Sequence, residues 1–253
     1  MDVAPDGIDP TVPNVARMYD YYLDGKDNFT VDRAAADRVL RIHPDAKDAA
    51  RANRAFLRRA VRHVVDSGVR QVVDLGAGLP TQGNTHEIAP EARVVYVDYD
   101  PIVCAHGRAL LARGANVDFV EADIRRPGPL LGTLGEIVDL TEPVAFLLTA
   151  VLHFVPDRPA FGLVDALRKA GPAGSMLVIS HAVDAESHSA SPALKVYARA
   201  TATLRLRTRE EIIRFFDGYE LAAPGLTFPH DWRPGADAQT VTTIGYAGVG
   251  RKP

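Results

Sequence analysis

Three aspartates stand where predicted strands end, and their type and spacing suit them to holding a small ligand. Asp74 ends the first predicted strand, Asp98 ends the second, and Asp123 follows the third. In open α/β sheets, ligands bind where the carboxyl ends of parallel strands meet. There Asp98 can accept hydrogen bonds from both hydroxyls of a ribose, and Asp123 can accept one from the amine of adenine. Asp74 can hold an ammonium group or fix the loop that follows it, so the three carboxylates favour a cationic adenosine compound.

A glycine-containing loop follows the first predicted strand. Gly76 and Gly78 flank Ala77, and glycine lets the backbone approach a ligand where a Cβ would collide. An ordinary tight turn is the alternative interpretation of this pair. Pro80 lacks an N–H donor, and Thr81 stands where a phosphate-binding fingerprint requires glycine. The loop therefore disfavours a pyrophosphate, and with it a nicotinamide-dependent oxidoreductase.

Other side chains near the same predicted edge each have two interpretations. Tyr99 either stacks on the adenosine or packs at the edge of the sheet, and Ile124 either offers its backbone N–H to the base or packs in the core. Thr149 follows the fourth predicted strand and is a further predicted ligand contact. His153 is the best candidate for a general base or substrate contact, although an isolated histidine at a strand end is often structural. His181, after the fifth strand, has the same standing.

The segment YDYYLDGKDNF near the N-terminus combines aromatic surfaces with polar tips. We expect Tyr19, Tyr22, Lys26, Asn28 and Phe29 to form a lid over a small ligand. The alternative is a helix whose aromatic side chains are packed into the core.

Composition limits the classes of partner. The chain has 253 residues, of which 47% are hydrophobic and 24% charged, as in ordinary globular proteins. The net charge of −3 gives no global attraction for nucleic acid or an anionic membrane, so we expect neither as a partner. No apolar run approaches the roughly 20 residues that span a bilayer. We therefore expect a cytoplasmic protein with a small-molecule substrate; the oligomeric state is open.

We also expect no metal site. Cys104 is the single cysteine, which excludes a disulfide within the chain and a cysteine-rich zinc site. His181, Glu186 and His188 lie close in sequence, but their spacing matches no helical ligand pair.

The order of predicted elements indicates an α/β fold. Apolar runs that predict strands alternate with helical segments, which is typical of a parallel sheet covered on both faces. The predicted strands are 71–75, 94–97, 116–120, 144–148 and 176–180, followed by a closing antiparallel pair near 219–222 and 240–249. We divide the chain into an N-terminal arm with helices (1–66), which covers the sheet and supplies the lid, and a ligand-binding part (67–253), both within one compact domain.

Taken together, these motifs resemble those of the class I S-adenosylmethionine-dependent methyltransferases. VVDLGAGLP, VVYVDYDP and FVEADI match, in order and spacing, that family's acidic strand end, Gly-x-Gly loop, second-strand acid and third-strand Asp. Pro80 departs from the family pattern, which commonly has a third glycine there. More narrowly, ARMYDYYLDGKDNF, GLPTQGNTHEIA and VVYVDYDPIV resemble an actinobacterial family long described as a domain of unknown function and now called S-adenosyl methyltransferase.

The resemblance implies a Rossmann-like fold with a mostly parallel seven-stranded sheet, an antiparallel last strand and an N-terminal helical extension. It implies S-adenosylmethionine as cofactor and S-adenosylhomocysteine as product, with an unidentified methyl acceptor. The alternative is a regulatory protein that binds either compound without catalysis. The resemblance carries no established substrate.

Overall fold

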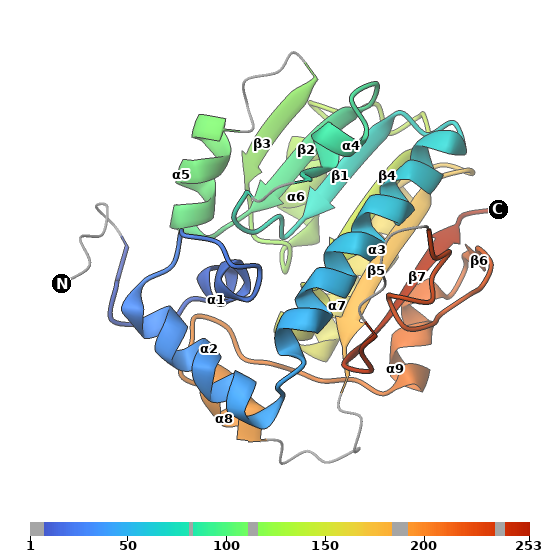
Figure 1. Cartoon of the computed structure of the whole chain (residues 1–253). Helices are drawn as coiled ribbons and strands as arrows, with labels where there is room; N and C mark the ends of the chain where they lie inside the picture. Colours follow the sequence, from blue (N-terminus) through green and yellow to red (C-terminus); the bar gives the residue numbers. More distant parts are fainter. Residues whose placement is uncertain (1–7, 81–82, 111–115, 184–191, 236–240) are drawn as a thin grey trace.

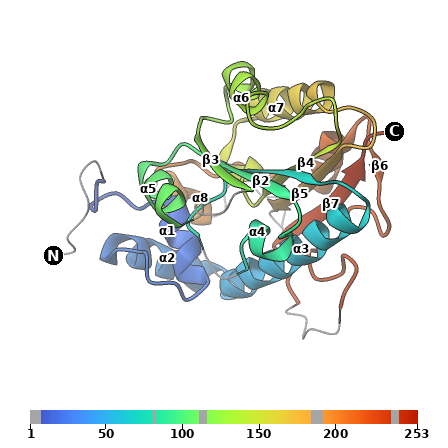
Figure 2. The same cartoon turned by 90° about the horizontal axis from the view of Figure 1, so that it is seen from above.

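One seven-stranded sheet runs through the centre of the computed structural model, which describes residues 8–80, 83–110, 116–183, 192–235 and 241–253 (Figures 1 and 2). The strands are β1 (Gln71–Leu75), β2 (Arg93–Asp98), β3 (Val117–Glu121), β4 (Val144–Thr149), β5 (Met176–Ala182), β6 (Glu220–Leu221) and β7 (Gly245–Arg251). Their order across the sheet is β3-β2-β1-β4-β5-β7-β6. β1 to β5 pair in parallel, whereas β7 pairs antiparallel with β5 and β6. The predicted mostly parallel sheet with an antiparallel last strand is confirmed.

Helices cover both faces of the sheet because the central strands are apolar on both sides. The covering helices are α3 (Ala46–Asp66), α4 (Thr85–Ile88), α5 (Pro101–Leu110), α6 (Pro127–Leu134), α7 (Asp157–Ala170) and α9 (Arg209–Ile213). Figure 2 shows α3 and α4 on one side of the sheet and α6 and α7 on the other. Successive side chains of β1 alternate accordingly: Val72 packs in the cluster that contains Phe56 of α3, and Val73 packs in the cluster that contains Leu163 of α7.

Three further helices form a group beside the carboxyl edge of the sheet. α1 (Val15–Tyr22), α2 (Thr30–Ile42) and α8 (Pro192–Tyr197) lie together in Figure 1 although α8 is far from the other two in sequence. They share an apolar cluster that includes Met18, Tyr22, Val39 and Tyr197. The N-terminal helices therefore pack mainly on one another and on α8, and α3 carries the chain from this group to the sheet.

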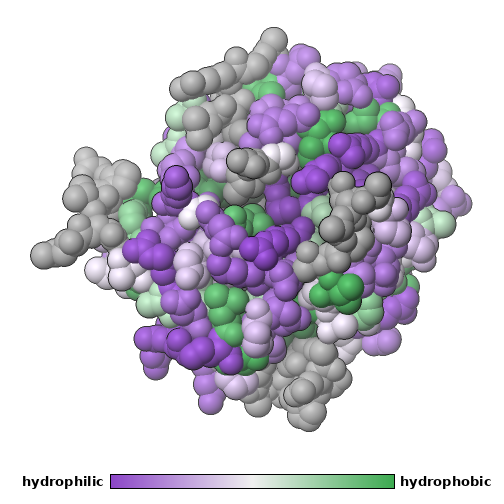
Figure 3. All heavy atoms as spheres, viewed as in Figure 1, coloured by the Kyte–Doolittle hydropathy of each residue, from purple (hydrophilic) through white to green (hydrophobic). Residues whose placement is uncertain are grey.

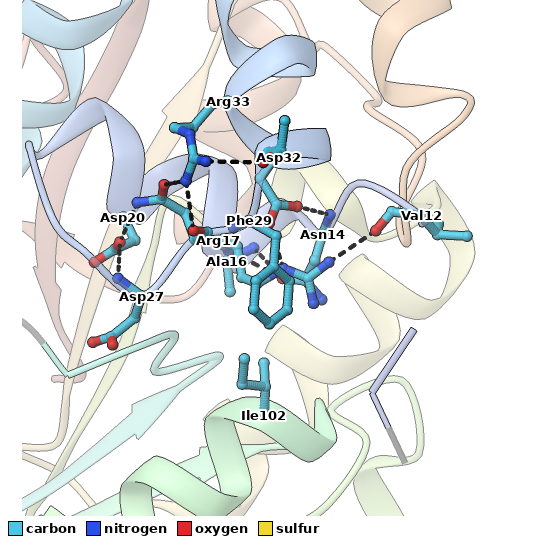
Figure 4. Close-up of polar contacts among 12 residues, drawn as sticks. Val12, Asn14, Ala16, Arg17, Asp20, Asp27, Phe29, Asp32, Arg33 and Ile102 are labelled. Carbon is cyan, nitrogen blue, oxygen red and sulfur yellow. Dashed lines mark hydrogen bonds and ion pairs between the residues drawn. The ribbon is translucent and has the colours of Figure 1, made fainter. Parts of the chain in front are cut away.

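A buried ion pair shapes the turn between α1 and α2 (Figure 4). Arg17 Nε lies 2.6 Å from Asp32 Oδ2, and the two side chains are 3% and 0% exposed. Asp32 also accepts hydrogen bonds from the backbone N–H groups of Asn14 and Phe29, at 2.8 Å each. The Arg17 guanidinium lies 4.8 Å from the centre of the Phe29 ring. Because Asp32 holds three partners, it fixes the path of the chain on both sides of α1.

Element boundaries differ from the sequence prediction mainly near the chain's end. The structure begins β7 at Gly245, whereas the prediction began this strand near residue 240, which lies outside the described residues. Just before the strand, Thr242 Oγ1 accepts the N–H of Ile244 at 3.2 Å, so only the carbonyl of Ile244 pairs across, with the N–H of Val183 at 2.7 Å. Neither α6 nor α8 was predicted.

Candidate functional site

A cavity of about 170 Å³ opens at the carboxyl edge of β1, β2 and β4; we call it the first cavity. Its wall contains every predicted cofactor contact except Asp74, namely Gly76, Ala77, Gly78, Asp98, Tyr99, Asp123, Ile124 and Thr149. The sheet order explains the grouping, because β1 lies between β2 and β4 and their ends are adjacent. Ile124 lines this cavity and is also buried in the core, and its predicted contact with the base stays a prediction.

The glycine loop needs glycine for two separate reasons. Gly76 has a φ of +72°, and a Cβ on it would lie 2.3 Å from Cγ2 of Val151. Gly78 has a φ of +66° with no heavy atom near its absent Cβ, so only its backbone conformation favours glycine. Gly76 N–H donates to the carbonyl of Val97 at 2.8 Å, which ties the loop to β2. The loop is therefore held against β2, with Val151 packed where a side chain on Gly76 would lie.

Asp98 is held rigidly at the floor of the first cavity. Its Oδ2 accepts the N–H of Gly78 at 2.9 Å, and its Oδ1 accepts those of Tyr99 and Asp100 at 2.8 and 3.0 Å. The side chain is only 8% exposed, and burial raises the pKa of its carboxyl although the backbone N–H groups oppose that shift. A carboxylate oxygen can accept more than one hydrogen bond, so Asp98 still has acceptor capacity for ligand hydroxyls.

Asp74 does not line the first cavity. Its Oδ2 accepts the hydroxyl proton of Thr85 at 2.7 Å, at the first residue of α4. Burial raises the pKa of Asp74 to about 6. The structure thus places Asp74 in the second of its two predicted roles, since it joins the end of β1 to the segment after the glycine loop.

Tyr99 and Asp123 are linked by a residue that sequence reasoning did not select. Arg125 Nε lies 2.9 and 3.0 Å from the two carboxylate oxygens of Asp123, and its Nη2 lies 2.8 Å from Oδ2. The same guanidinium lies 5.1 Å from the centre of the Tyr99 ring, which is 43% exposed. Arg125 holds the pKa of Asp123 below its usual range against the effect of burial. In this arrangement both carboxylate oxygens of Asp123 are bonded to Arg125. A bound adenine would have to share these oxygens with Arg125 or displace its guanidinium.

Three polar residues from the helices complete the first cavity, and none was predicted. Asp20 of α1 and Asn53 and Arg54 of α3 line it together with the glycine loop. Asp20 Oδ2 accepts hydrogen bonds from Asn28 Nδ2 and from the backbone N–H of Asp27, and burial raises the pKa of its carboxyl. Arg54 donates to the carbonyl of Gly83 at 2.8 Å. Among the described residues of this wall, Arg54 and Arg125 are the arginines, and there is no lysine.

A second cavity, of about 260 Å³, adjoins the first. Side chains from α1, α2, α3, α8, the end of β5 and the segment before β7 line it. The residues that line both cavities, which we call the shared wall, are Tyr19, Tyr22, Asn53, Ala150, His153, Phe154 and Tyr197. Asn53 ties this wall together, because its Nδ2 donates to Tyr19 and its Oδ1 accepts from Ser180 of β5.

The two predicted histidines are buried and carry defined protons. His153 Nδ1 accepts the backbone N–H of Ala182 at 3.2 Å, so the proton of the neutral ring is on Nε2. His181 Nδ1 lies 2.7 Å from the carbonyl of Ala182, and its Nε2 lies 2.8 Å from Nη1 of Arg207, so it carries its proton on Nδ1. Burial lowers the pKa of His153 to about 3 and that of His181 well below its usual value. This geometry disfavours the predicted general-base role of His153 and leaves the substrate-contact role.

The predicted lid residues divide into two groups. Tyr19 and Tyr22 belong to the shared wall, and the Tyr22 hydroxyl lies 3.3 Å from that of Tyr197. Lys26 is exposed, Asn28 holds Asp20 and the carbonyl of Gly25, and Phe29 packs under Arg17; none of these three lines either cavity. The second group shapes the turn after α1 rather than facing a ligand.

The described residues contain neither a metal-binding cluster nor a membrane-spanning helix. No group of three or more His, Cys, Asp or Glu side chains there could hold a metal ion, and Glu186 and His188 lie outside those residues. Over the same part of the chain, no helix is long and apolar enough to cross a membrane. The face shown in Figure 3 is mainly hydrophilic, with small scattered hydrophobic areas.

Comparison with known proteins gives concordant results. The S-adenosyl methyltransferase family profile matches residues 1–253. A putative methyltransferase from Thermobifida fusca is similar to this chain at 39% identity and a TM-score of 0.89, over 98% of both chains. A DUF574 family protein from Streptomyces avermitilis is 40% identical, with a TM-score of 0.87, over 96% of this chain and 98% of that one. No protein of curated function matches the sequence.

A more distant likeness concerns the fold alone. The N-methyltransferase NodS from Bradyrhizobium japonicum, in complex with S-adenosyl-L-homocysteine, has a TM-score of 0.53 at 15% identity, over 94% of this chain and 99% of that one. The match over the full length and the two similar structures agree with the glycine loop, the held Asp98 and the antiparallel β7. They confirm the resemblance drawn from the sequence motifs, and with it the S-adenosylmethionine cofactor. The chain belongs to the S-adenosyl methyltransferase family.

Proposed function

We propose that this protein transfers the methyl group of S-adenosylmethionine to a small molecule, with the cofactor in the first cavity and the methyl acceptor in the second. The observation that carries the proposal is the shared wall, because a donor and an acceptor molecule in adjoining cavities can meet there. An enzyme that holds both reactants in line gains most of its rate from positioning.

The residues of the first cavity fit the parts of the cofactor. Asp98 would accept the ribose hydroxyls, and the wall around Tyr99 and Ile124 would hold the adenine. Asp20 and Arg54 line the same cavity as the glycine loop and carry opposite charges. They suit the ammonium and carboxylate groups of the methionine end. At Gly78 no described atom lies near the absent Cβ, which leaves the backbone open there.

The bound cofactor supplies a methyl group already activated by its sulfonium. The protein's task is therefore to bind, orient and exclude water, more than to generate a strong nucleophile. The buried Asn53 and Tyr22 and the half-buried Tyr19 give the shared wall a fixed shape for that purpose. The net charge of −3 and the size of the second cavity favour a small molecule over a nucleic acid.

Calorimetric titration of the purified protein tests the cofactor assignment. We expect S-adenosylmethionine and S-adenosylhomocysteine to bind with micromolar affinity, and NAD not to bind. Binding of NAD, or of none of the three, would contradict the proposal.

Turnover tests the catalytic assignment separately. Release of S-adenosylhomocysteine is followed after fractions of bacterial small-molecule extract are added to the protein and cofactor. A fraction that accelerates the release supports the enzyme. Tight binding without turnover by any fraction would favour a regulatory protein instead.

A further inference from the structure

A chain of hydrogen bonds with one direction leads to the shared wall. The Arg207 guanidinium donates to His181 Nε2, and His181 Nδ1 donates to the carbonyl of Ala182. The N–H of the same Ala182 donates to His153 Nδ1. Each donor therefore points from Arg207 toward His153, whose remaining polar atom is the Nε2–H. That atom has no hydrogen-bond partner within the described part of the chain, and its ring lines both cavities.

Arg207 fixes the direction of this chain because it can only donate. Its side chain is 0% exposed and pairs with Asp157 at 2.9 Å. It also donates to the carbonyls of Leu152 and Val155, at 2.8 and 2.9 Å. A buried charge held by this many partners does not reorient easily. It also disfavours a second positive charge on either imidazole, in agreement with the lowered pKa of both histidines. His153 is thus a neutral and polarised donor.

The described lining of the second cavity offers little to neutralise an anion. No lysine or arginine is found among its described lining residues, and Asp45 is its one carboxylate there. Five aromatic side chains line it, namely Tyr19, Tyr22, Phe154, Tyr197 and Tyr246. Carboxylates and phosphates find no cation in such a cavity, whereas a planar apolar ring finds surfaces on which to pack.

We propose that the second cavity binds an uncharged aromatic compound that carries a hydroxyl group, and that the hydroxyl oxygen accepts a hydrogen bond from His153 Nε2 and receives the methyl group. This assignment rests on the proposed function. It makes His153 a residue that touches the substrate, and it makes Arg207 and His181 positioning residues that act through it.

The direction of the donor explains why oxygen is preferred to nitrogen. A neutral amine has a single lone pair, which cannot attack a methyl carbon while it accepts a hydrogen bond. An oxygen has further lone pairs, so it can accept the hydrogen bond from His153 and still attack the methyl carbon, and its proton passes to solvent water as the new bond forms. The oxygen then forms the new C–O bond, the C–S bond breaks, and its electron pair stays on sulfur.

Binding of three compounds of one shape tests the assignment. The probes are 1-naphthol, 1-naphthoate and 1-naphthylamine, titrated calorimetrically with S-adenosylhomocysteine present. We expect naphthol to bind at least about 10-fold more tightly than naphthoate, since the carboxylate would be buried without a cation. We expect His153→Phe to lower naphthol affinity about 10-fold, which corresponds to one lost hydrogen bond. S-adenosylhomocysteine affinity should change less than about twofold.

Matched variants separate this role from a structural one. His153→Gln offers an N–H of similar reach and should restore most naphthol binding. His63→Phe is the control, because it makes the same substitution away from the shared wall. His63 lies toward the C-terminal end of α3, roughly 15 Å along the helix from Asn53 of the shared wall. This variant should change neither affinity. ¹⁵N NMR of the unliganded protein should show His153 with its proton on Nε2 and His181 with its proton on Nδ1.

Each contrary result overturns the assignment in a defined way. Naphthoate bound as tightly as naphthol, or naphthol unaffected by His153→Phe, removes the donor role. Faster methylation of naphthylamine than of naphthol removes the oxygen assignment. Binding of S-adenosylhomocysteine without any of the three probes removes the aromatic hydroxyl class. Failure of S-adenosylhomocysteine itself to bind would instead contradict the proposed function.

Discussion

The two adjoining cavities are built from different kinds of sequence. The first is made chiefly of short segments at the ends of neighbouring strands, and it places arginines and carboxylates on its wall. The second joins α1 and α3 with α8 and the segment before β7, and its described wall is aromatic with one carboxylate. A universal cofactor can be held by local motifs, whereas the acceptor cavity depends on packing between distant parts of the chain.

The largest effect is expected from Gly76→Ala, which damages the first cavity alone. The new Cβ would lie 2.3 Å from Val151 Cγ2, and the positive φ disfavours any side chain. We expect the free energy of unfolding to fall by about 2–5 kcal/mol and cofactor binding to be lost. Urea denaturation and calorimetry measure the two effects.

The controls for that variant are Gly78→Ala and the double variant Gly76→Ala, Val151→Ala. Gly78→Ala should cost only about 1 kcal/mol, because its Cβ would meet no atom. The double variant should recover part of the stability, since the clash disappears while the strain at φ remains. Equal losses for both single glycine variants would mean that Val151 is not the cause.

Asp98→Ala should weaken S-adenosylmethionine binding by about 1–3 kcal/mol, through lost hydrogen bonds to the ribose. It should leave naphthol binding to the second cavity nearly unchanged, as the contrast between the cavities requires. Asp118→Ala, at an exposed ion pair with Arg93 outside both cavities, is the control for removal of a carboxylate. An unchanged cofactor affinity in folded Asp98→Ala would remove this residue from the site.

Asp74→Asn should stabilise the protein at pH 7.5. Burial raises the pKa of Asp74 to about 6, so protonation of this carboxyl favours the folded state. That contribution to the free energy of unfolding is complete below about pH 4 and is lost as the pH rises through 6. The charged carboxyl then costs about 2–3 kcal/mol, whereas an asparagine can still accept from Thr85 without a charge. The difference in free energy of unfolding between variant and wild type should vanish near pH 4. A difference that is independent of pH would contradict the raised pKa.

The smallest effect is expected from Tyr22→Phe, which changes the second cavity at the Tyr22–Tyr197 hydroxyl pair. Loss of this buried hydrogen bond should lower the free energy of unfolding by about 0.5–1.5 kcal/mol and leave cofactor affinity unchanged. Tyr21→Phe, which removes a partly buried bond to Asp37, should cost less. Naphthol binding by Tyr22→Phe then reports directly on the acceptor side of the shared wall.

The sequence predicts the first cavity well because alternating strands and helices constrain strand ends to one edge. Once Asp98 and Asp123 follow neighbouring parallel strands, their proximity hardly depends on anything distant. Side-chain partners were less predictable. Arg125 lies two residues from Asp123, and nothing in the pattern indicates that it would take both carboxylate oxygens.

The second cavity could not be predicted, for a physical reason. Tyr22 and Tyr197 are 175 residues apart in sequence, and their contact depends on the packing of α8, a helix too short to be recognised by its periodicity. Arg54 belongs to α3, and nothing in its local sequence indicates that it lines the first cavity. Lys26, Asn28 and Phe29 share the aromatic and polar character of a lid, but the buried pair Arg17–Asp32 determines where that turn lies.

Helix α3 has a consequence for how the molecule unfolds. Its Phe56 is in the core beneath the sheet, its Ala50 is in the cluster formed by α1 and α2, and between them Asn53 bonds to both Tyr19 and Ser180. Neither the helical group nor the sheet can lose α3 and keep its apolar residues covered. Melting should therefore be cooperative, with one transition for all parts of the chain. The polypeptide leaves α3 at Asp66 and enters the sheet at Gln71, and both reactant cavities should form or disappear together.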